Sequence, residues 1–242
     1  MTAKLQYLES EQSTGLKINV KKTKSMRINV ANNNSFRMSD EEIKEVDRFT
    51  YLGSVLTRAG GADEDVMSRI TKANAAFVQL YPVWKARDIS TRTKLKIFSS
   101  NVKSVFLYGC ETWKVSSSLT QKLQVLINRC LRKILKIYWP EVISNRELWK
   151  DTDEEPVGIQ IKKRKWRWVG HTLRKDPDAV ERQALSWNPQ GHRRRGRPRM
   201  TWRRTIEEEI RDAGKNWREV RALAANRVRW RFFVEALCSA QE

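Results

Sequence analysis

The sequence predicts a mainly α-helical protein with a small α+β unit at its N-terminus. Three observations support this prediction. Apolar and polar residues alternate in short runs between residues 16 and 56, which is typical of strands. From residue 62 onward apolar residues recur every three or four positions, which is typical of amphipathic helices. Hydrophobic residues make up 40% of the chain, enough to form a buried core.

The first 60 residues predict a short helix followed by strands. We expect the helix over 4–14, ended by Gly15, and strands at 16–20, at 24–30 and within 46–56. Asn32, Asn33 and Asn34 mark a turn between them. A unit of this size is too small to be stable without neighbours.

Helical patterns then follow in two groups. The first group starts at the caps Asp63 and Ser90 and at about Leu119, and its last member ends before Pro140. The apolar stripes of these three helices can bury one another as a bundle. The second group covers about 157–174, 201–213 and 216–238, with a loop over 188–200.

The net charge of the chain restricts its partners. Its 242 residues hold 48 Lys and Arg against 28 Asp and Glu, a formal charge of +20, which attracts nucleic-acid phosphates or anionic membranes. No apolar run approaches the roughly 20 residues of a membrane span, and residues 1–10 lack a signal-peptide core. We therefore expect RNA and DNA as partners, no membrane, and a nuclear or cytoplasmic protein that is not secreted.

The composition changes after the acidic stretch 151–156, which we interpret as a linker. Residues 161–242 hold 22 Lys and Arg against 10 Asp and Glu, a net charge of +12, and six of the ten Trp. The predicted domains are 1–60, the helical bundle 61–150 and a basic Arg/Trp-rich region 151–242 that binds nucleic acid.

The outer faces of the predicted bundle are basic. We expect them to face nucleic acid rather than to form a merely solvated surface, because the charges are mostly of one sign. The residues in question are Lys94, Lys96, Lys103, Lys122, Arg129, Arg132, Lys133 and Lys136.

The most distinctive basic motif is the arginine loop, residues 193–199. Gly196 and Pro198 keep it extended, and extended arginines can enter a narrow minor groove. Its Arg-Gly-Arg-Pro core resembles an AT-hook. The alternative is a loop that grips phosphates without sequence preference. Its candidate binding residues are Arg193, Arg194, Arg195, Arg197 and Arg199.

Aromatic residues alternate with arginines in the same region. We expect Trp168, Trp217 and Trp230 in the core, and Trp166 and Trp202 partly exposed, where they could stack on bases. Further candidate binding residues near Trp166 are Lys163, Arg164 and His171.

No catalytic or metal site is predicted. The acidic groups 63–65 and 151–155 are interpreted as a helix start and a linker rather than as carboxylates that converge on divalent ions. Cys110, Cys130 and Cys238 lack the spacing of zinc ligands and indicate reduced thiols. No cofactor is therefore expected in this chain.

Five motifs, in order along the chain, resemble the region after the catalytic palm strands of non-LTR (LINE-type) retrotransposon reverse transcriptases. Residues 15–19 with Lys22, Thr23 and Lys24 resemble the segment that follows those strands, and Phe49-Thr50-Tyr51-Leu52-Gly53 resembles the primer-grip hairpin. Residues 107–113 resemble the thumb, and 168–171 and 195–202 resemble the region after the thumb.

The resemblance implies partial palm hairpins, a helical thumb-like bundle and a role in target-primed reverse transcription. It places Lys22 and Lys24 near the active site of the family, and Tyr51, Leu52 and Gly53 in the primer grip. The intact enzymes would use Mg²⁺. Their catalytic Asp-Asp hairpin is expected just upstream of the matched segment, and no two adjacent aspartates occur in this chain.

Three functional hypotheses follow. The first is the C-terminal part of a reverse transcriptase, a truncated copy that binds RNA template and DNA primer but is inactive alone. The second is a domesticated, non-enzymatic protein that binds DNA or RNA through the arginine loop. The third is a polymerase completed by a partner chain that supplies the palm.

Overall fold

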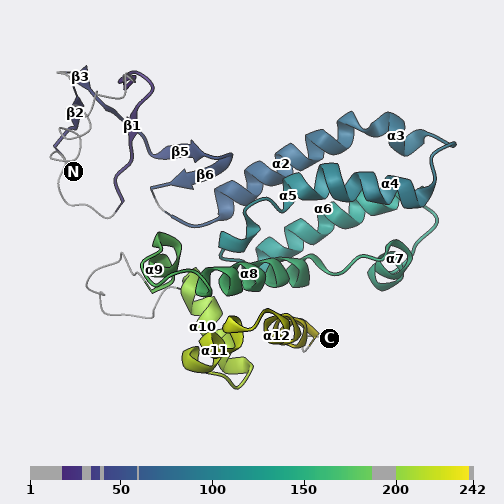
Figure 1. Ribbon diagram of the computed structural model, residues 1–242. Coiled ribbons are helices and arrows are strands. Elements are labelled where there is room, and N and C mark those ends of the chain that lie inside the picture. The colour runs from purple at the N-terminus through teal and green to yellow at the C-terminus, as the bar shows by residue number, and fades with distance from the viewer. Residues whose placement is uncertain (1–17, 29–33, 39–40, 59, 187–199, 240–242) are drawn as a thin grey trace. The chain divides into compact units, whose positions relative to one another are not determined.

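We describe the computed structural model of the chain over residues 18–28, 34–38, 41–58, 60–186 and 200–239. This part of the chain is mainly helical, as predicted, and its strands all precede residue 58 (Figure 1). The chain divides into two compact units, Met1–Asp65 (unit 1) and Val66–Glu242 (unit 2). No helix among these residues is long and apolar enough to cross a membrane.

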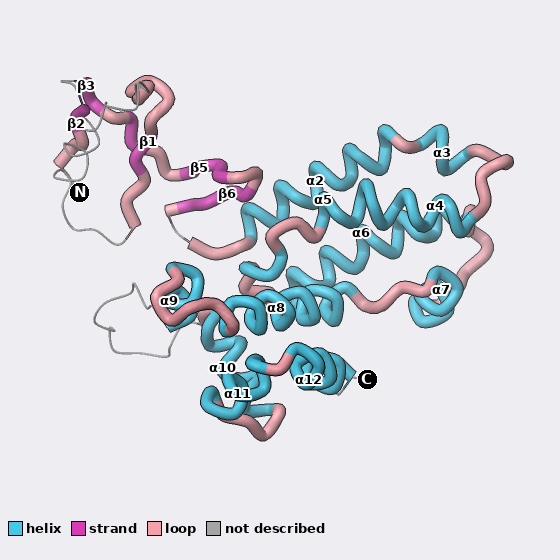
Figure 2. Tube along the Cα trace, viewed as in Figure 1, coloured by secondary structure: helices cyan, strands magenta, loops and turns pink. Residues whose placement is uncertain are grey.

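Unit 1 contains very short strands (Figure 2). β1 (Lys24–Ser25) pairs in parallel with β4 (Lys44–Glu45), and β2 (Arg37–Met38) pairs antiparallel with β3 (Glu41–Glu42). The strands predicted at 16–20 and 24–30 are thus reduced to two residues in the described part. One reason lies at Asn19, whose carbonyl and side chain accept the backbone N–H of Lys22 and form a turn instead of a ladder.

The segment predicted as one strand within 46–56 is a β-hairpin. β5 (Arg48–Tyr51) pairs antiparallel with β6 (Ser54–Thr57). The two loop residues, Leu52 and Gly53, have φ of 48° and 79°. Two consecutive left-handed residues match the twist of the flanking strands, and a glycine adopts this conformation without a steric penalty. The chain therefore reverses where the sequence pattern alone predicted that a strand would end.

Unit 2 is a succession of helices that starts within α2. The predicted helices near 63, 90, 119, 157 and 201 are present, and the one predicted over 216–238 is divided at Asn226. The side chain of Asn226 accepts the N–H groups of Val228 and Arg229 and so begins a new helix. The elements are α2 (Asp63–Gln79), α3 (Tyr81–Lys85), α4 (Thr91–Ile97), the π-helical η2 (Phe98–Lys103), α5 (Ser104–Phe106), the 3-10 turn η3 (Cys110–Thr112), α6 (Ser117–Leu135), α7 (Asn145–Thr152), α8 (Val157–Leu173), α9 (Val180–Ser186), α10 (Trp202–Asp212), α11 (Trp217–Ala225) and α12 (Arg227–Ser239).

The first half of unit 2 has an aromatic core between α2, α3 and η2. Phe77 stacks on Trp84 at a centroid distance of 5.1 Å and meets the edge of Phe98 at 6.3 Å. The indole N–H of Trp84 donates to the carbonyl of Phe77 at 2.8 Å. Most of the apolar stripe of α6 is buried, as the sequence predicts, and Leu123 and Leu131 are fully buried.

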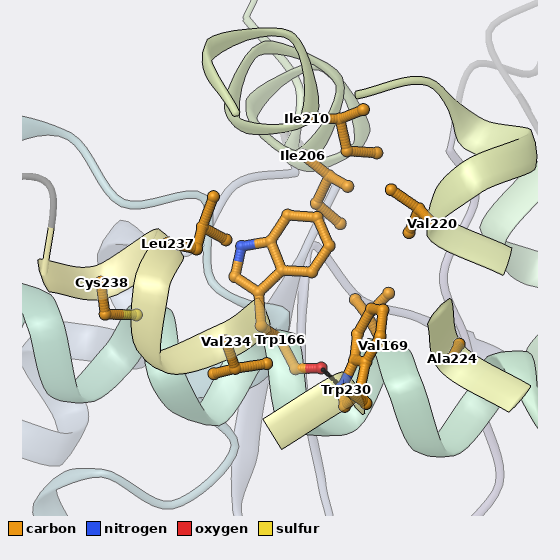
Figure 3. Packing of buried hydrophobic residues seen from close by; sticks show 10 residues of the cluster. All are labelled: Trp166, Val169, Ile206, Ile210, Val220, Ala224, Trp230, Val234, Leu237 and Cys238. Atoms are coloured by element: carbon orange, nitrogen blue, oxygen red, sulfur yellow. Dashed lines mark hydrogen bonds between the residues drawn. The ribbon is translucent and has the colours of Figure 1, made fainter. Parts of the chain in front are cut away.

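The second half of unit 2 packs around Trp166 of α8, which is fully buried (Figure 3). Its ring is surrounded by residues of α10, α11 and α12, among them Ile206, Val220 and Leu237. The indole N–H of Trp230 donates to the carbonyl of Trp166 at 3.1 Å (Figure 3). Helices remote in sequence thus share one hydrophobic core.

Gly170 permits a close approach between α8 and α12 in this core. A Cβ added at Gly170 would lie 2.0 Å from the indole nitrogen of Trp230, which no side chain could tolerate. The glycine of the Trp168–His171 motif is therefore required by packing between α8 and α12.

The acidic stretch 151–156 is part of the fold of unit 2 rather than the linker that the sequence suggests. Thr152 ends α7, and its hydroxyl donates to the carbonyl of Leu148 at 2.6 Å. Glu154 pairs with Lys103 of η2 at 2.6 Å. Because α8 also packs on α6 and η3, contacts cross the expected boundary near residue 150, and residues 66–242 form one unit.

Candidate nucleic-acid interface

One face of α6 carries cations that remain exposed. The apolar stripe of this helix is buried, and positions 122, 129 and 133 lie outside that stripe, along its flank. Lys122, Arg129, Lys133 and the capping residue Lys136 are all exposed, and we call them the α6 basic face. Arg129 donates to the Asn74 side chain at 3.0 Å. Within the described residues, none of the four forms an ion pair. Their positive charge is therefore available to a polyanion.

Two exposed aromatic residues follow the C-terminal end of α6. Tyr138 is 60% exposed and Trp139 is 89% exposed. Arg132, also predicted on the outer face, instead donates to the carbonyl of Ile143 and to the Asn145 side chain, which links the end of α6 to α7. Sequence reasoning missed Tyr138 and Trp139, although they stand outside the apolar stripe of α6. Aromatics beside cations are the usual platform for unpaired bases.

Lys94, predicted on a basic outer face, is buried with 3% of its surface exposed. Its ammonium group donates to the carbonyls of Trp84 at 3.1 Å and Ala86 at 2.6 Å. The prediction was wrong because the chain after α3 turns back over α4, and these carbonyls need a donor. Lys96 of the same helix is exposed, as expected.

Two other predicted binding lysines are held by carboxylates. Lys103 pairs with Glu154 in a largely buried contact. Lys163 lies between Glu155 at 2.5 Å and Glu235 at 3.0 Å, and these partners raise the pKa of its ammonium group. The acidic stretch 151–155 thus neutralises cations that the sequence assigned to nucleic acid. A phosphate would have to displace a carboxylate to reach either lysine.

Trp166 is not the exposed stacking residue that the sequence predicts. It is fully buried, and its N–H donates to Glu209, which also pairs with Lys165. Trp230 is in the core as expected, while Trp168 and Trp217 are half-buried. The alternation with arginine misled the prediction, because α10, α11 and α12 cover this side of α8.

The motifs after the predicted thumb meet at a packing junction. Trp202, half-buried as expected, contacts Trp168 edge to face at 5.7 Å and donates to the carbonyl of Glu111 at 2.8 Å. Arg164 is exposed and donates to the carbonyl of Leu107 at 3.4 Å. His171 is exposed at the end of the motif. These contacts give residues 107–113, 168–171 and 202 a shared structural role.

The site residues of unit 1 are exposed. Lys22 and Lys24 lie at the turn and at β1, and the structure brings no carboxylate to either of them within the described residues. Tyr51 is 59% and Leu52 is 73% exposed at the hairpin tip beside Gly53. The role of this tip as a primer grip stays a prediction.

The arginine loop, with Arg193, Arg194, Arg195, Arg197 and Arg199, lies outside the described residues. Beyond it, the C-terminal helices add exposed arginines that the sequence analysis did not single out. Arg218 and Arg221 of α11 and Arg227, Arg229 and Arg231 of α12 are exposed, and within the described part of the chain none of them forms an ion pair. The basic character predicted for this region is thus partly carried by α11 and α12.

The carboxylates and thiols of the described residues do not form a Mg²⁺ or zinc site. No group of three or more His, Cys, Asp or Glu side chains gathers there in a way that could hold a metal ion. In the acidic cluster 63–65, Asp65 accepts the N–H of Val55 at 2.9 Å, and Glu64 pairs with Arg48. The described carboxylates therefore do not fit the Mg²⁺ that the resemblance implies.

The three cysteines are free and buried. Burial raises the pKa of Cys110 to about 12 and that of Cys130 to about 11, and it also raises the pKa of Cys238. All three are neutral thiols near pH 7, whereas a nucleophile or metal ligand is the thiolate.

Comparisons with known proteins agree with part of the resemblance. Residues 76–108 match DUF6451, a family described as a domain of unknown function. No solved structure matches the chain. A protein of Caenorhabditis elegans, F52C9.6, is 26% identical over 213 residues, which cover 81% of this chain and 73% of that protein. It is described as uncharacterized and transposon-derived, so this chain is similar to a protein that originates from a mobile element.

Proposed function

We propose that this chain is a non-catalytic, nucleic-acid-binding part of a non-LTR retrotransposon reverse transcriptase, and that it binds template and primer through the α6 basic face. The observation that carries the proposal is the row of exposed cations on α6 without carboxylate partners. The similarity to a transposon-derived protein supports an origin from a mobile element.

The dimensions of the α6 basic face suit a nucleic-acid backbone. Lys122 and Lys133 are 11 residues apart, which corresponds to about 16 Å along a helix. One strand of a duplex presents a phosphate roughly every 3.4 Å of axis, so this distance spans about five nucleotides. Tyr138 and Trp139 lie just past this face and could stack on bases that leave the duplex.

The test is the salt dependence of binding. The triple variant Lys122→Gln, Arg129→Gln and Lys133→Gln is compared with the wild-type chain by fluorescence anisotropy on a short DNA duplex. Each lost phosphate contact removes about 0.9 from the log–log slope, so the slope should fall by about 2.7. A flat salt response of the wild-type chain would contradict the proposal.

A matched control separates this face from total charge. The variant Arg87→Gln, Arg92→Gln and Lys114→Gln also removes three exposed cations, but from other parts of unit 2. Its slope should stay near that of the wild-type chain. Equal losses in the two triple variants would mean that general charge, not the α6 basic face, supports binding.

The non-catalytic half of the proposal has a separate test. Incubation with a primer, an RNA template and Mg²⁺ should give no primer extension, because the described carboxylates do not converge. Extension that a single carboxylate substitution abolishes would show that the chain is itself a polymerase.

A further inference from the structure

A small pocket between four helices of unit 2 is lined by three arginines. Its volume is about 140 Å³, and it lies among α8, α9, α10 and α11. Arg182 comes from α9, Arg203 from α10 and Arg221 from α11, and Leu173 and Leu185 provide apolar walls. Three guanidinium groups from three different helices repel one another, so an arrangement of this kind favours an anion between them.

Two of these arginines are held in place by the backbone. Arg182 donates to the carbonyl of Lys175, and Arg203 donates to the carbonyl of Ser186 at 2.7 Å. Arg203 also pairs with Glu207 at 2.9 Å. A guanidinium has five N–H donors, so both arginines keep donors for a further partner. Side chains that are fixed beforehand lose little conformational entropy when a ligand binds.

The third arginine and a tryptophan provide the remaining donors. Arg221 is exposed and forms no ion pair within the described residues. Trp217, four residues earlier on α11, lines the same pocket and is on the same helix face. Its indole N–H is buried without a hydrogen-bond partner in the described part of the chain. A buried donor of this kind requires an acceptor, which an anion in the pocket would supply.

Charge and size together select the anion. Three guanidinium groups against the single carboxylate of Glu207 leave a formal charge of +2. A phosphate monoester carries about −1.5 to −2 and has three acceptor oxygens, whereas a phosphodiester or a carboxylate carries −1. A pocket of 140 Å³ holds several water-sized groups but is smaller than the roughly 300 Å³ of a drug-sized ligand site.

We propose that this arginine pocket binds a phosphate dianion, either as free inorganic phosphate or as the terminal phosphate monoester of a nucleic-acid strand. Binding of the terminal phosphate of a strand rests on the proposed nucleic-acid function, whereas binding of free phosphate does not. The binding free energy comes from charge-assisted hydrogen bonds of Arg182, Arg203 and Arg221 to the phosphate oxygens, which the apolar walls strengthen by excluding water.

The experiment uses the full chain, inorganic phosphate and three oligonucleotides of one sequence that carry a 5′-phosphate, a 3′-phosphate or only hydroxyl ends. Inorganic phosphate should raise the melting temperature in a saturable way. At least one phosphorylated strand should bind about tenfold tighter than the unphosphorylated strand, the effect expected of a new charge-assisted bond. Saturable binding of phosphate without any preference among the strands would support the pocket as a site for free phosphate.

The variant Arg221→Gln should abolish both effects without unfolding the chain, because this side chain is exposed and holds no other element. Arg218→Gln, on the same helix but outside the pocket, should retain them. Absence of any response to phosphate or to strand ends, or equal responses of the two variants, would overturn the proposal. The α6 triple variant should keep its response to inorganic phosphate, so failure of the pocket and failure of the α6 basic face are distinguishable.

Discussion

The helices α6 and α8 are both long, basic and amphipathic, yet unit 2 uses their charges in opposite ways. On α6 the cations Lys122 and Lys133 are exposed and form no ion pair within the described residues. On α8, Lys163 and Lys165 are held by glutamates, and Lys162 donates to the carbonyl of Leu237. The difference arises because other elements of unit 2 pack over α8 but leave one side of α6 exposed. The flank of α6 that carries these cations is exposed, whereas α8 packs against α6, α9, α11, α12 and η3.

A count of basic residues therefore does not measure a binding surface. A lysine that a glutamate holds must lose that partner before it can bind a phosphate. An exposed lysine without such a partner attracts a polyanion at little cost. The proposed nucleic-acid interface therefore lies on α6, whereas α8 is the scaffold of the C-terminal core.

The largest expected effect concerns the tryptophans that distinguish the two regions. Trp166→Ala should destabilise the fold by about 3–5 kcal/mol, because it leaves a cavity in a fully buried core. Trp139→Ala, at the end of α6, should change stability by less than about 0.5 kcal/mol, because this side chain is almost fully exposed. Urea unfolding measures both. Similar costs for the two variants would abolish the distinction between core and surface.

An intermediate effect is expected in the acidic stretch 151–156, whose Glu154 and Glu155 pair with lysines of unit 2. Glu154→Gln should cost about 1.5–3 kcal/mol, because the ammonium group of Lys103 then loses its charged partner in a largely buried place. Glu155→Gln is the matched control and should cost less than about 1 kcal/mol, because this glutamate is half-exposed. Unfolding curves at low salt compare the two. A larger cost at Glu155 would mean that the stretch is attached mainly through Lys163.

The effect that is smallest at neutral pH compares the thiols of the two regions, Cys130 on α6 and Cys110 on η3, which packs against α8. Burial raises the pKa of both thiols in the folded chain, so the unfolded chain releases these protons at lower pH. Stability should be unaffected by these thiols below about pH 9 and should fall above it by roughly 1.4 kcal/mol per pH unit and per thiol. The fall ends near pH 11 for Cys130 and near pH 12 for Cys110.

The variants Cys110→Ala and Cys130→Ala identify the source of this slope. Each should remove its own part of the difference in stability between pH 9 and pH 11, even if it lowers the stability at every pH. Unfolding free energies across this range provide the measurement. An unchanged slope in both variants would assign the pH dependence to other groups.

Much of the local structure could be predicted from the sequence. The predicted cap Ser90 accepts the backbone N–H of Thr93, because an N-cap depends only on residues within one turn. The buried stripe of α6 follows in the same way from apolar spacing. The hairpin at Leu52 and Gly53 was only half predicted, because alternation marks a strand but does not say where it reverses.

The candidate site could be predicted only in part from the sequence. Helix periodicity predicted the α6 basic face, and its residues are exposed in the structure. Lys94 and Lys103 were assigned to the surface because they lie off the apolar stripes of their helices, and Trp166 because it alternates with arginine. The structure corrects all three. The arginine pocket could not be predicted, since its three arginines come from three helices spread over 40 residues.

By itself the sequence determined the helical class, most helix starts and the strongly positive charge, because these depend on local propensity, spacing and composition. Only the tertiary structure decided which charges are free. It did so by folding the acidic stretch 151–156 onto η2 and α8 and by covering Trp166 with α10, α11 and α12. The physical reason is that ion pairing and burial depend on groups brought together from distant parts of the chain, about which local pattern carries no information.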